Sequence, residues 1–109
     1  MFKPKCLIAE KEIPNIQEDF RSAQRIEQYR VGKVAFYSPE GLRWNYIPIP
    51  EIQKAEEGIR VLPGGHCNPF RAKKPELEII TAKEQFSFPL DRPENLKKIL
   101  SALEENEIK

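Results

Sequence analysis

Alternating hydrophobic and polar positions predict two β-hairpins, and the first of them covers residues 33 to 49. This stretch is the richest in aromatic side chains. Leu42, Trp44 and Tyr46 recur at a period of two, the spacing at which side chains share one face of a β-strand. We therefore expect them on a single buried face, with the intervening polar residues on the other face. The Ser-Pro-Glu-Gly run at residues 38 to 41 has the composition of the turn between the strands.

The second hairpin is predicted from residue 76 to residue 90. Its hydrophobic residues alternate with polar ones on both sides of residues 82 to 84, which we interpret as the turn. The alternation indicates one buried face and one mixed face, as in many antiparallel sheets. The residues at the alternating positions are Leu77, Ile79 and Thr81 before the turn and Phe86, Phe88 and Leu90 after it.

An amphipathic helix is predicted near the end of the chain, over residues 91 to 106. Its apolar residues are spaced i, i+3, i+4 and i+7, so they form one stripe along the helix. These residues are Leu96, Ile99, Leu100 and Leu103. Asp91 is the expected N-cap, because Pro93 and Glu94 follow it at positions typical of a first helical turn.

A second, shorter helix is predicted to begin at Asn15, because Asn15 with Glu18 three residues later matches a capping box. Two end points are possible for this helix. The helix stops near Ser22 and gives way to a strand that reaches Val31, or it continues to Arg30. We favour the short helix, because the stretch before Val31 would then pair with the following strand.

The remaining segments are expected to be short strands and loops. Residues 5 to 9 form a short edge strand or pack as an arm. Two prolines within residues 48 to 50 must end the pairing of the first hairpin. Residues 51 to 62 are interpreted as a turn or bulge that leads into a strand. Residues 63 to 75 contain three prolines and the only Gly-Gly pair, so we expect the longest loop there.

The order of these elements indicates an α+β fold, in which a bent antiparallel sheet or partly open barrel is closed by the C-terminal helix. We expect a single domain over residues 1 to 109. Within it, residues 1 to 24 form an N-terminal arm and short helix, residues 25 to 90 form the sheet, and residues 91 to 106 form the capping helix.

This order of elements resembles the pleckstrin-homology-like (PH-like) barrel, in particular its small bacterial versions. The residues that carry the resemblance are 33–38, 41–49 with Ile52, 76–81, 85–90 and the helix 93–103. The resemblance implies a binding or scaffolding role instead of catalysis. Members of this family often bind phosphoinositides through a basic loop between their first two strands. Here that loop would lie near Arg30, Gly32 and Lys33, and it is too short and too weakly basic for a phosphate cage.

Composition limits the classes of partner. The 109 residues are 39% hydrophobic and 32% charged, which is typical of a folded domain. The net charge of +1 gives no overall field that would attract nucleic acid, which we do not expect as a partner. The apolar run near the N-terminus is too short for a signal peptide or a transmembrane segment. Cys6 and Cys67 could form one disulfide at most, so we expect reduced thiols and a cytoplasmic location.

Few residues suggest catalysis or metal binding. His66 and Cys67 are neighbours in sequence, whereas a Cys–His nucleophile needs two side chains that face each other across space. A zinc site made of Cys6, His66 and Cys67 would lack a fourth ligand and the usual paired spacing. We therefore expect neither an enzyme nor a metal or other cofactor.

The basic segment before the second hairpin is the strongest candidate for a binding site. Its candidate residues are Arg60, His66, Arg71, Lys73 and Lys74. Basic residues in a loop more often only keep the loop exposed to solvent, but these residues could contact a phosphate group or an acidic partner. We predict a non-catalytic interaction module that binds a protein or peptide partner or forms a homo-oligomer. The alternative is binding of an anionic lipid or a phosphorylated ligand through residues 60 to 74.

Overall fold

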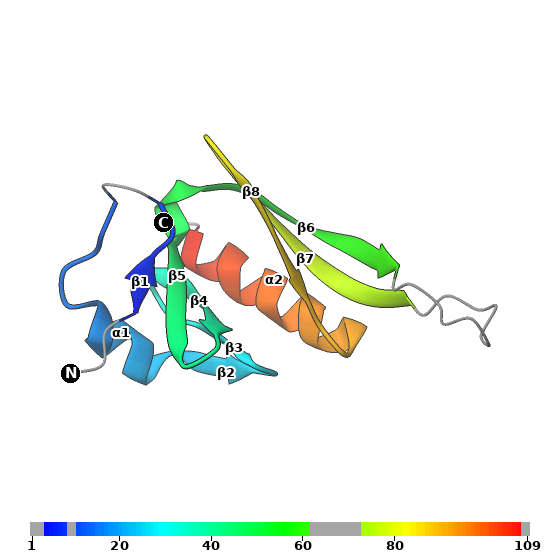
Figure 1. The fold of residues 1–109 in the computed structure, drawn as a ribbon, viewed down its shortest axis with the longest axis horizontal. Coiled ribbons are helices and arrows are strands. Elements are labelled where there is room, and N and C mark those ends of the chain that lie inside the picture. The colour runs from blue at the N-terminus through cyan, green and yellow to red at the C-terminus, as the bar shows by residue number, and fades with distance from the viewer. Residues whose placement is uncertain (1–3, 9–10, 62–72, 108–109) are drawn as a thin grey trace.

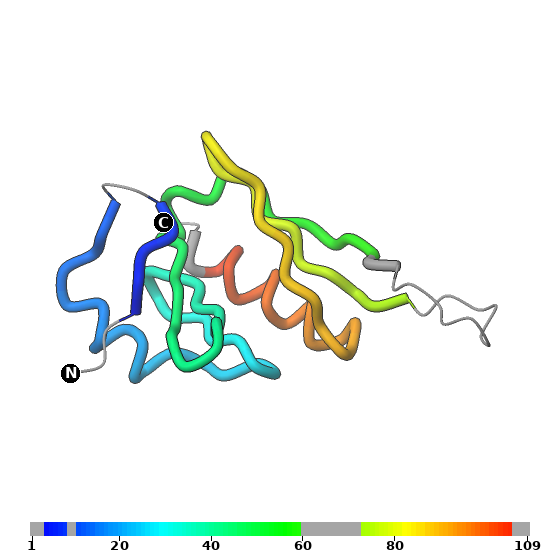
Figure 2. Tube along the Cα trace, viewed as in Figure 1, coloured from blue at the N-terminus to red at the C-terminus, as the bar shows by residue number. Residues whose placement is uncertain are grey.

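A computed structural model describes residues 4–8, 11–61 and 73–107, and Figure 1 shows their strands in two groups with helix α2 beside both. Figure 2 shows the path of the chain, which builds the first group, continues into the second, and returns along α2 toward the first. The elements are β1 (Lys5–Cys6), α1 (Ile16–Ser22), β2 (Gln24–Ile26), β3 (Tyr29–Val31), β4 (Ala35–Glu40), β5 (Arg43–Pro48), the 3-10 helix η1 (Ile49–Glu51), β6 (Ile52–Val61), β7 (Lys73–Thr81), β8 (Gln85–Pro89) and α2 (Pro93–Glu107).

The strands form two sheets, with the orders β1-β5-β4-β3-β2 and β6-β7-β8. The predicted α+β class is confirmed, but the single antiparallel sheet is not. Strand β1 pairs parallel with β5, so the first sheet is mixed. In the described part of the chain the two sheets stay separate and close no barrel. The prolines at the end of β5 and in η1 account for the break, because proline cannot donate a ladder hydrogen bond.

The hairpin β4–β5 is buried on both faces, which corrects the prediction of one buried face. Phe36 and Ile47 pair across the hairpin and belong to the core shared with the second sheet. Tyr37 and Tyr46 pair on the opposite face and belong to a second core beneath α1. Asn45, expected on a solvated face, is also buried. A strand with both faces covered gives no clean alternation, so periodicity could identify the strand but not its surroundings.

The turn of this hairpin lies later than predicted. Strand β4 continues to Glu40, and Gly41 and Leu42 form a two-residue loop. Gly41 has a φ of 61°, which glycine adopts without the steric cost of a side chain. The predicted turn at residues 38 to 41 is therefore wrong, because Pro39 occupies a strand position. Leu42, predicted to be buried, is 100% exposed at the tip.

The main core lies between the two sheets and α2, which contacts strands of both sheets and η1. The predicted apolar stripe of α2 is confirmed, since Leu96, Ile99 and Leu103 are buried in this core. Leu100 is partly buried against it. The other buried residues of this core are Ile26, Tyr29, Val31, Phe36, Ile47, Ile49, Ile52, Leu77, Ile79 and Leu90.

Helix α1 covers the outer face of the first sheet and is fixed there by Asp19. The Asp19 carboxylate accepts a hydrogen bond of 2.6 Å from the Tyr37 hydroxyl and one of 2.8 Å from the Lys33 backbone N–H. The Val34 N–H donates to the same carboxylate at 3.4 Å. The close approach requires glycine at position 32, since a Cβ atom on Gly32 would overlap the carboxylate.

Arg30 lies beside α1 between two aromatic rings. Its guanidinium carbon is 4.4 Å from the centroid of the Phe20 ring and 5.4 Å from that of Trp44. This geometry is a cation–π contact with both rings. Arg30, which the family resemblance placed near a phosphate-binding loop, therefore packs α1 against the sheet.

The N-terminal region confirms the short helix and corrects its details. Helix α1 ends at Ser22, and Lys5–Cys6 forms the predicted edge strand. The capping box is wrong, because Asn15 has a left-handed backbone with φ 59° and makes no side-chain cap hydrogen bond. The strand expected to reach Val31 is a hairpin, which turns at Glu27 with φ 55°.

The N-terminus of α2 is capped by a residue from a distant turn. The Glu27 carboxylate accepts hydrogen bonds from the backbone N–H groups of Asp91 at 2.7 Å and Arg92 at 3.1 Å. It also accepts one from the Asn95 side-chain amide at 2.9 Å. Asp91 was predicted as the N-cap, but the first helical hydrogen bond goes to the Arg92 carbonyl. The prediction is therefore wrong, because α2 begins at Pro93 and its carboxylate cap is supplied by the tertiary fold.

The predictions for the second sheet are largely confirmed. Strand β6 begins with the expected irregularity in its pairing, between Ile52 and Lys54. Strands β7 and β8 flank the predicted turn at residues 82 to 84. The expected loop at residues 63 to 75 ends earlier than predicted, since β7 already begins at Lys73. Residues 62 to 72 lie outside the described part of the chain.

The buried tyrosine pair predicts a loss of stability at alkaline pH. Burial, together with the hydrogen bond to Asp19 and the negative charge of its carboxylate, raises the pKa of Tyr37 above the ordinary tyrosine value of about 10. Burial likewise raises the pKa of Tyr46. The unfolded chain loses these protons near pH 10 while the folded protein retains them, so the folded state binds more protons and stability falls as pH rises further.

Urea unfolding at pH 9, 10 and 11 measures this effect. Between pH 10 and 11 the free energy of unfolding should fall by about 1 kcal/mol through Tyr37, because the unfolded side chain is already half ionised at pH 10. Tyr37→Phe should be less stable at pH 9 but should show a shallower decline. An equal decline in both proteins would mean that other groups cause it.

Candidate binding site

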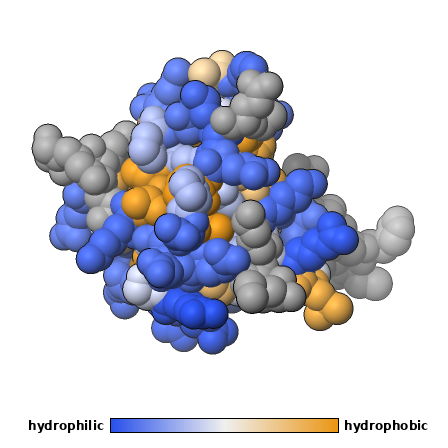
Figure 3. All heavy atoms as spheres, turned by 90° about the vertical axis from the view of Figure 1, so that its left-hand side faces the viewer, coloured by the Kyte–Doolittle hydropathy of each residue, from blue (hydrophilic) through white to orange (hydrophobic). Residues whose placement is uncertain are grey.

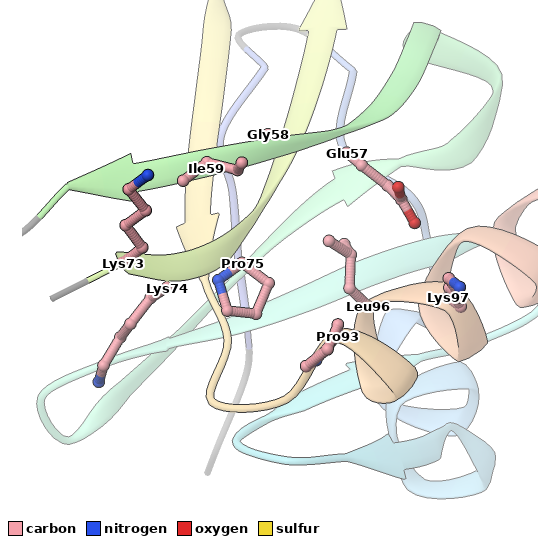
Figure 4. Close-up of a pocket in the computed structure, with 9 residues that line it drawn as sticks. All are labelled: Glu57, Gly58, Ile59, Lys73, Lys74, Pro75, Pro93, Leu96 and Lys97. Carbon is pink, nitrogen blue, oxygen red and sulfur yellow. The ribbon is translucent and has the colours of Figure 1, made fainter.

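A hollow of about 520 Å³ lies where the end of the β6–β7 hairpin faces the first turns of α2. Figure 4 shows its lining, with Glu57 and Leu96 extending into the space between β6 and α2. Strand β6 contributes Glu57, Gly58 and Ile59, β7 contributes Lys73, Lys74 and Pro75, and α2 contributes Pro93, Leu96 and Lys97.

Three ammonium groups border the hollow against one carboxylate. Lys73 and Lys74 lie on β7 at one end, and Lys97 lies on α2 at the other (Figure 4). Lys74 points away from the centre and forms an ion pair of 3.3 Å with Asp91. Lys73 and Lys97 make no ion pair with the residues that the structure describes. The local field therefore favours an anionic group.

The centre of the hollow is apolar. Pro75 and Leu96 face each other across it in Figure 4, and Ile59 is close to Lys73. Ile59 is 69% exposed, although isoleucine is among the residues most often buried. Apolar area beside unpaired positive charge suits a ligand that carries both apolar and acidic groups.

Strand β6 gives the hollow an open backbone edge. It pairs with β7 on one side and is the outer strand of its sheet in the described part of the chain. An edge strand presents N–H and C=O groups that can pair with an added strand. Register places Gly58 opposite Glu76, and a Cβ on Gly58 would lie 3.0 Å from a Glu78 carboxylate oxygen. Gly58, which has no side chain, therefore leaves room for the Glu78 side chain of the neighbouring strand.

The structure brings together only part of the predicted site. Lys73 and Lys74 both line the hollow. His66, Arg71 and the side chain of Arg60 lie outside the described residues, so their place remains a prediction. Sequence reasoning missed Lys97, which was not among the candidate binding residues. The sequence gives little indication of such a residue, because a helical pattern does not show which exposed side of the helix faces a neighbouring sheet.

The opposite end of the molecule differs from this site. Figure 3 views that end, which carries α1 and β1, and shows a mostly hydrophilic surface with a small hydrophobic area in its middle. Over the described residues, no group of three or more His, Cys, Asp or Glu side chains could hold a metal ion. None of the helices in the same residues has the length and apolar character needed to cross a membrane.

The comparisons with known proteins found no matching family model, no matching curated protein and no matching solved structure.

Proposed function

We propose that this protein is a non-catalytic interaction module that binds an acidic, extended segment of a partner protein. The observation that carries the proposal is the combination of Lys73 and Lys97, an apolar centre and an open strand edge around one hollow. Extended peptides commonly bind by adding a strand to such an edge, while side-chain pockets select their sequence. The unpaired ammonium groups of Lys73 and Lys97 would select acidic side chains.

The order of elements supports the proposal. Strands β2 to β5, then β6 to β8, then the C-terminal α2 follow the order that resembles a PH-like domain. We propose this relationship on the order alone, because the two sheets close no barrel in the described part of the chain. A binding role agrees with this resemblance. The aromatic side chains pack in the two cores, which also agrees with it.

Fluorescence anisotropy with designed peptides tests the proposal. One labelled peptide alternates Glu with Val and Leu, and a matched peptide has Lys in place of Glu. The acidic peptide should bind and the basic one should not. Replacing both Lys73 and Lys97 by Glu should weaken binding about tenfold or more, because it converts two attractions into repulsions.

Lys83→Glu is the matched control, since Lys83 is exposed in the β7–β8 turn and outside the hollow. This variant changes the net charge in the same direction and should bind normally. Equal binding of the two peptides, or equal loss in the control, would contradict a local acidic-segment site. If the protein sediments as a dimer and the Lys73 and Lys97 changes abolish the dimer, self-association would be favoured instead.

Anionic lipid is a second candidate ligand, favoured by the exposed Ile59 beside Lys73. An apolar side chain next to basic residues can insert at a membrane surface while the charges contact head groups. Flotation with vesicles of phosphatidylcholine alone or with phosphatidylserine separates the two candidates. Salt-sensitive flotation with the anionic vesicles alone, together with failure of the acidic peptide, would support lipid as the ligand.

A further inference from the structure

A second hollow, of about 460 Å³, lies between β8 and the end of the β4–β5 hairpin. It shares no residue with the lysine-bordered hollow. Its walls are of two kinds. One wall carries the polar side chains of Ser38, Glu40 and Asn45, and the other carries the rings of Phe86 and Phe88.

The polar wall offers hydrogen-bonding groups to the hollow. Ser38 and Asn45 pair across the hairpin and are each only 6% exposed. The Asn45 side-chain N–H donates to the Glu40 carboxylate at 3.3 Å, which leaves the Asn45 carbonyl oxygen as an acceptor. The Ser38 hydroxyl has no partner among the residues that the structure describes. Neither oxygen is a buried atom left without a partner, a condition that the described residues show only at Arg30 Nε, so both remain available to hydrogen-bond a polar group that enters the hollow.

The charge of the polar wall determines whether a cationic or an anionic group is attracted to the hollow. Among the described residues that line this hollow, Glu40 alone is charged at neutral pH. Arg43 lies opposite Glu40 in the hairpin register, but it does not line the hollow, and no ion pair joins the two in the described structure. A cationic group would therefore be attracted and an anionic group repelled.

The aromatic wall selects the body of the occupant. Phe86 and Phe88 are partly buried, and their ring centroids are 6.4 Å apart. Phe88 is held in place by edge contacts with Tyr29 and Phe36. Partly open phenyl rings offer apolar contact area and attract a nearby cation through the ring face.

We propose that this hollow binds small organic ammonium compounds with an aromatic body. The ammonium group donates hydrogen bonds to the Glu40 carboxylate and the Asn45 carbonyl oxygen, and the ring packs against Phe86 and Phe88. Ser38 supplies a further polar contact. The site is independent of the acidic-segment site, because the two hollows have opposite charge and no common residue.

Titrations followed by NMR amide shifts test the site with three probes of similar shape. These are phenethylammonium, the neutral 2-phenylethanol and the anionic 3-phenylpropanoate. The ammonium compound should shift amides of β4, β5 and β8 and should bind about tenfold more tightly than the alcohol, as expected for a hydrogen bond assisted by charge. The propanoate should bind most weakly.

Glu40→Gln should abolish the preference for ammonium over alcohol, whereas Glu57→Gln in the other hollow should leave it unchanged. Asn45→Leu should weaken binding of the ammonium compound and change the melting temperature only slightly, because the one hydrogen bond that it removes goes to the exposed Glu40 carboxylate. Equal affinities for the alcohol and the ammonium compound in the unmodified protein, or preference for the propanoate, would overturn the proposal. A large drop in melting temperature for Asn45→Leu would assign Asn45 to the fold instead.

Discussion

Asp19→Ala is expected to lower the free energy of unfolding by about 3 kcal/mol, because one carboxylate holds α1 to the β3–β4 turn. The Tyr37 hydroxyl donates to it at 2.6 Å, and the backbone N–H groups of Lys33 and Val34 also point to it. Alanine would leave these donors without their acceptor beside a buried tyrosine. The melting temperature should fall by about 12 °C for a domain of this size.

Glu18→Ala is the matched control for Asp19→Ala. It removes a neighbouring acidic residue of α1 that is exposed, so its effect should stay within about 0.5 kcal/mol. Asp19→Asn keeps one acceptor oxygen and should fall between the two. Similar stabilities of the Glu18 and Asp19 variants would show that the carboxylate does not anchor α1.

A double-mutant cycle with Gly32→Ala extends this test. The added Cβ would overlap the Asp19 carboxylate, so Gly32→Ala alone should destabilise the protein strongly. In the Asp19→Ala background the same change should cost much less, since the obstructing group is absent. Additive effects would contradict the close contact between the two residues.

Glu27→Ala is expected to lower the free energy of unfolding by about 2 kcal/mol, because it removes the carboxylate cap of α2. The N–H groups of Asp91 and Arg92 and the Asn95 amide would lose their acceptor. The positive φ of 55° at this position adds little to the effect, since alanine is strained there as well. Urea unfolding measures the change.

Glu94→Ala is the matched control, because Glu94 lies in the first turn of α2 but is exposed, and within the described chain its one ion pair is with Arg92 at 3.8 Å. It should change stability by about 0.5 kcal/mol at most. If the two glutamate variants had equal effects, the helix dipole alone would explain them and the long-range cap would be unimportant.

The cap at Glu27 also bears on the proposed function. The same first turns of α2 place Pro93, Leu96 and Lys97 at the lysine-bordered hollow. A helix that frays at its start would displace these side chains from β6. Stability and acidic-peptide affinity should therefore fall together in the Glu27 variant, whereas the Lys73 and Lys97 changes should lower affinity alone.

The sequence by itself determined the elements whose signals are local. The stripe of Leu96, Ile99 and Leu103 predicted α2, and the alternation around residues 82 to 84 predicted the β7–β8 hairpin. The prolines around Ile49 correctly predicted the end of β5. Each of these features depends on residues within a few positions of one another, so periodicity and backbone preference were sufficient.

Only the tertiary structure decided which faces are covered and which distant groups meet. Glu27 reaches the start of α2 across 64 residues of sequence, and Asp19 meets Tyr37 across 18. Tyr46 and Ile47 are both buried because α1 and the second sheet cover opposite faces of β5. Lys97 and Lys73 border the same hollow because α2 packs against the β6–β7 hairpin. A one-dimensional pattern reports how polar a side chain is, whereas its partners depend on how the elements pack in space.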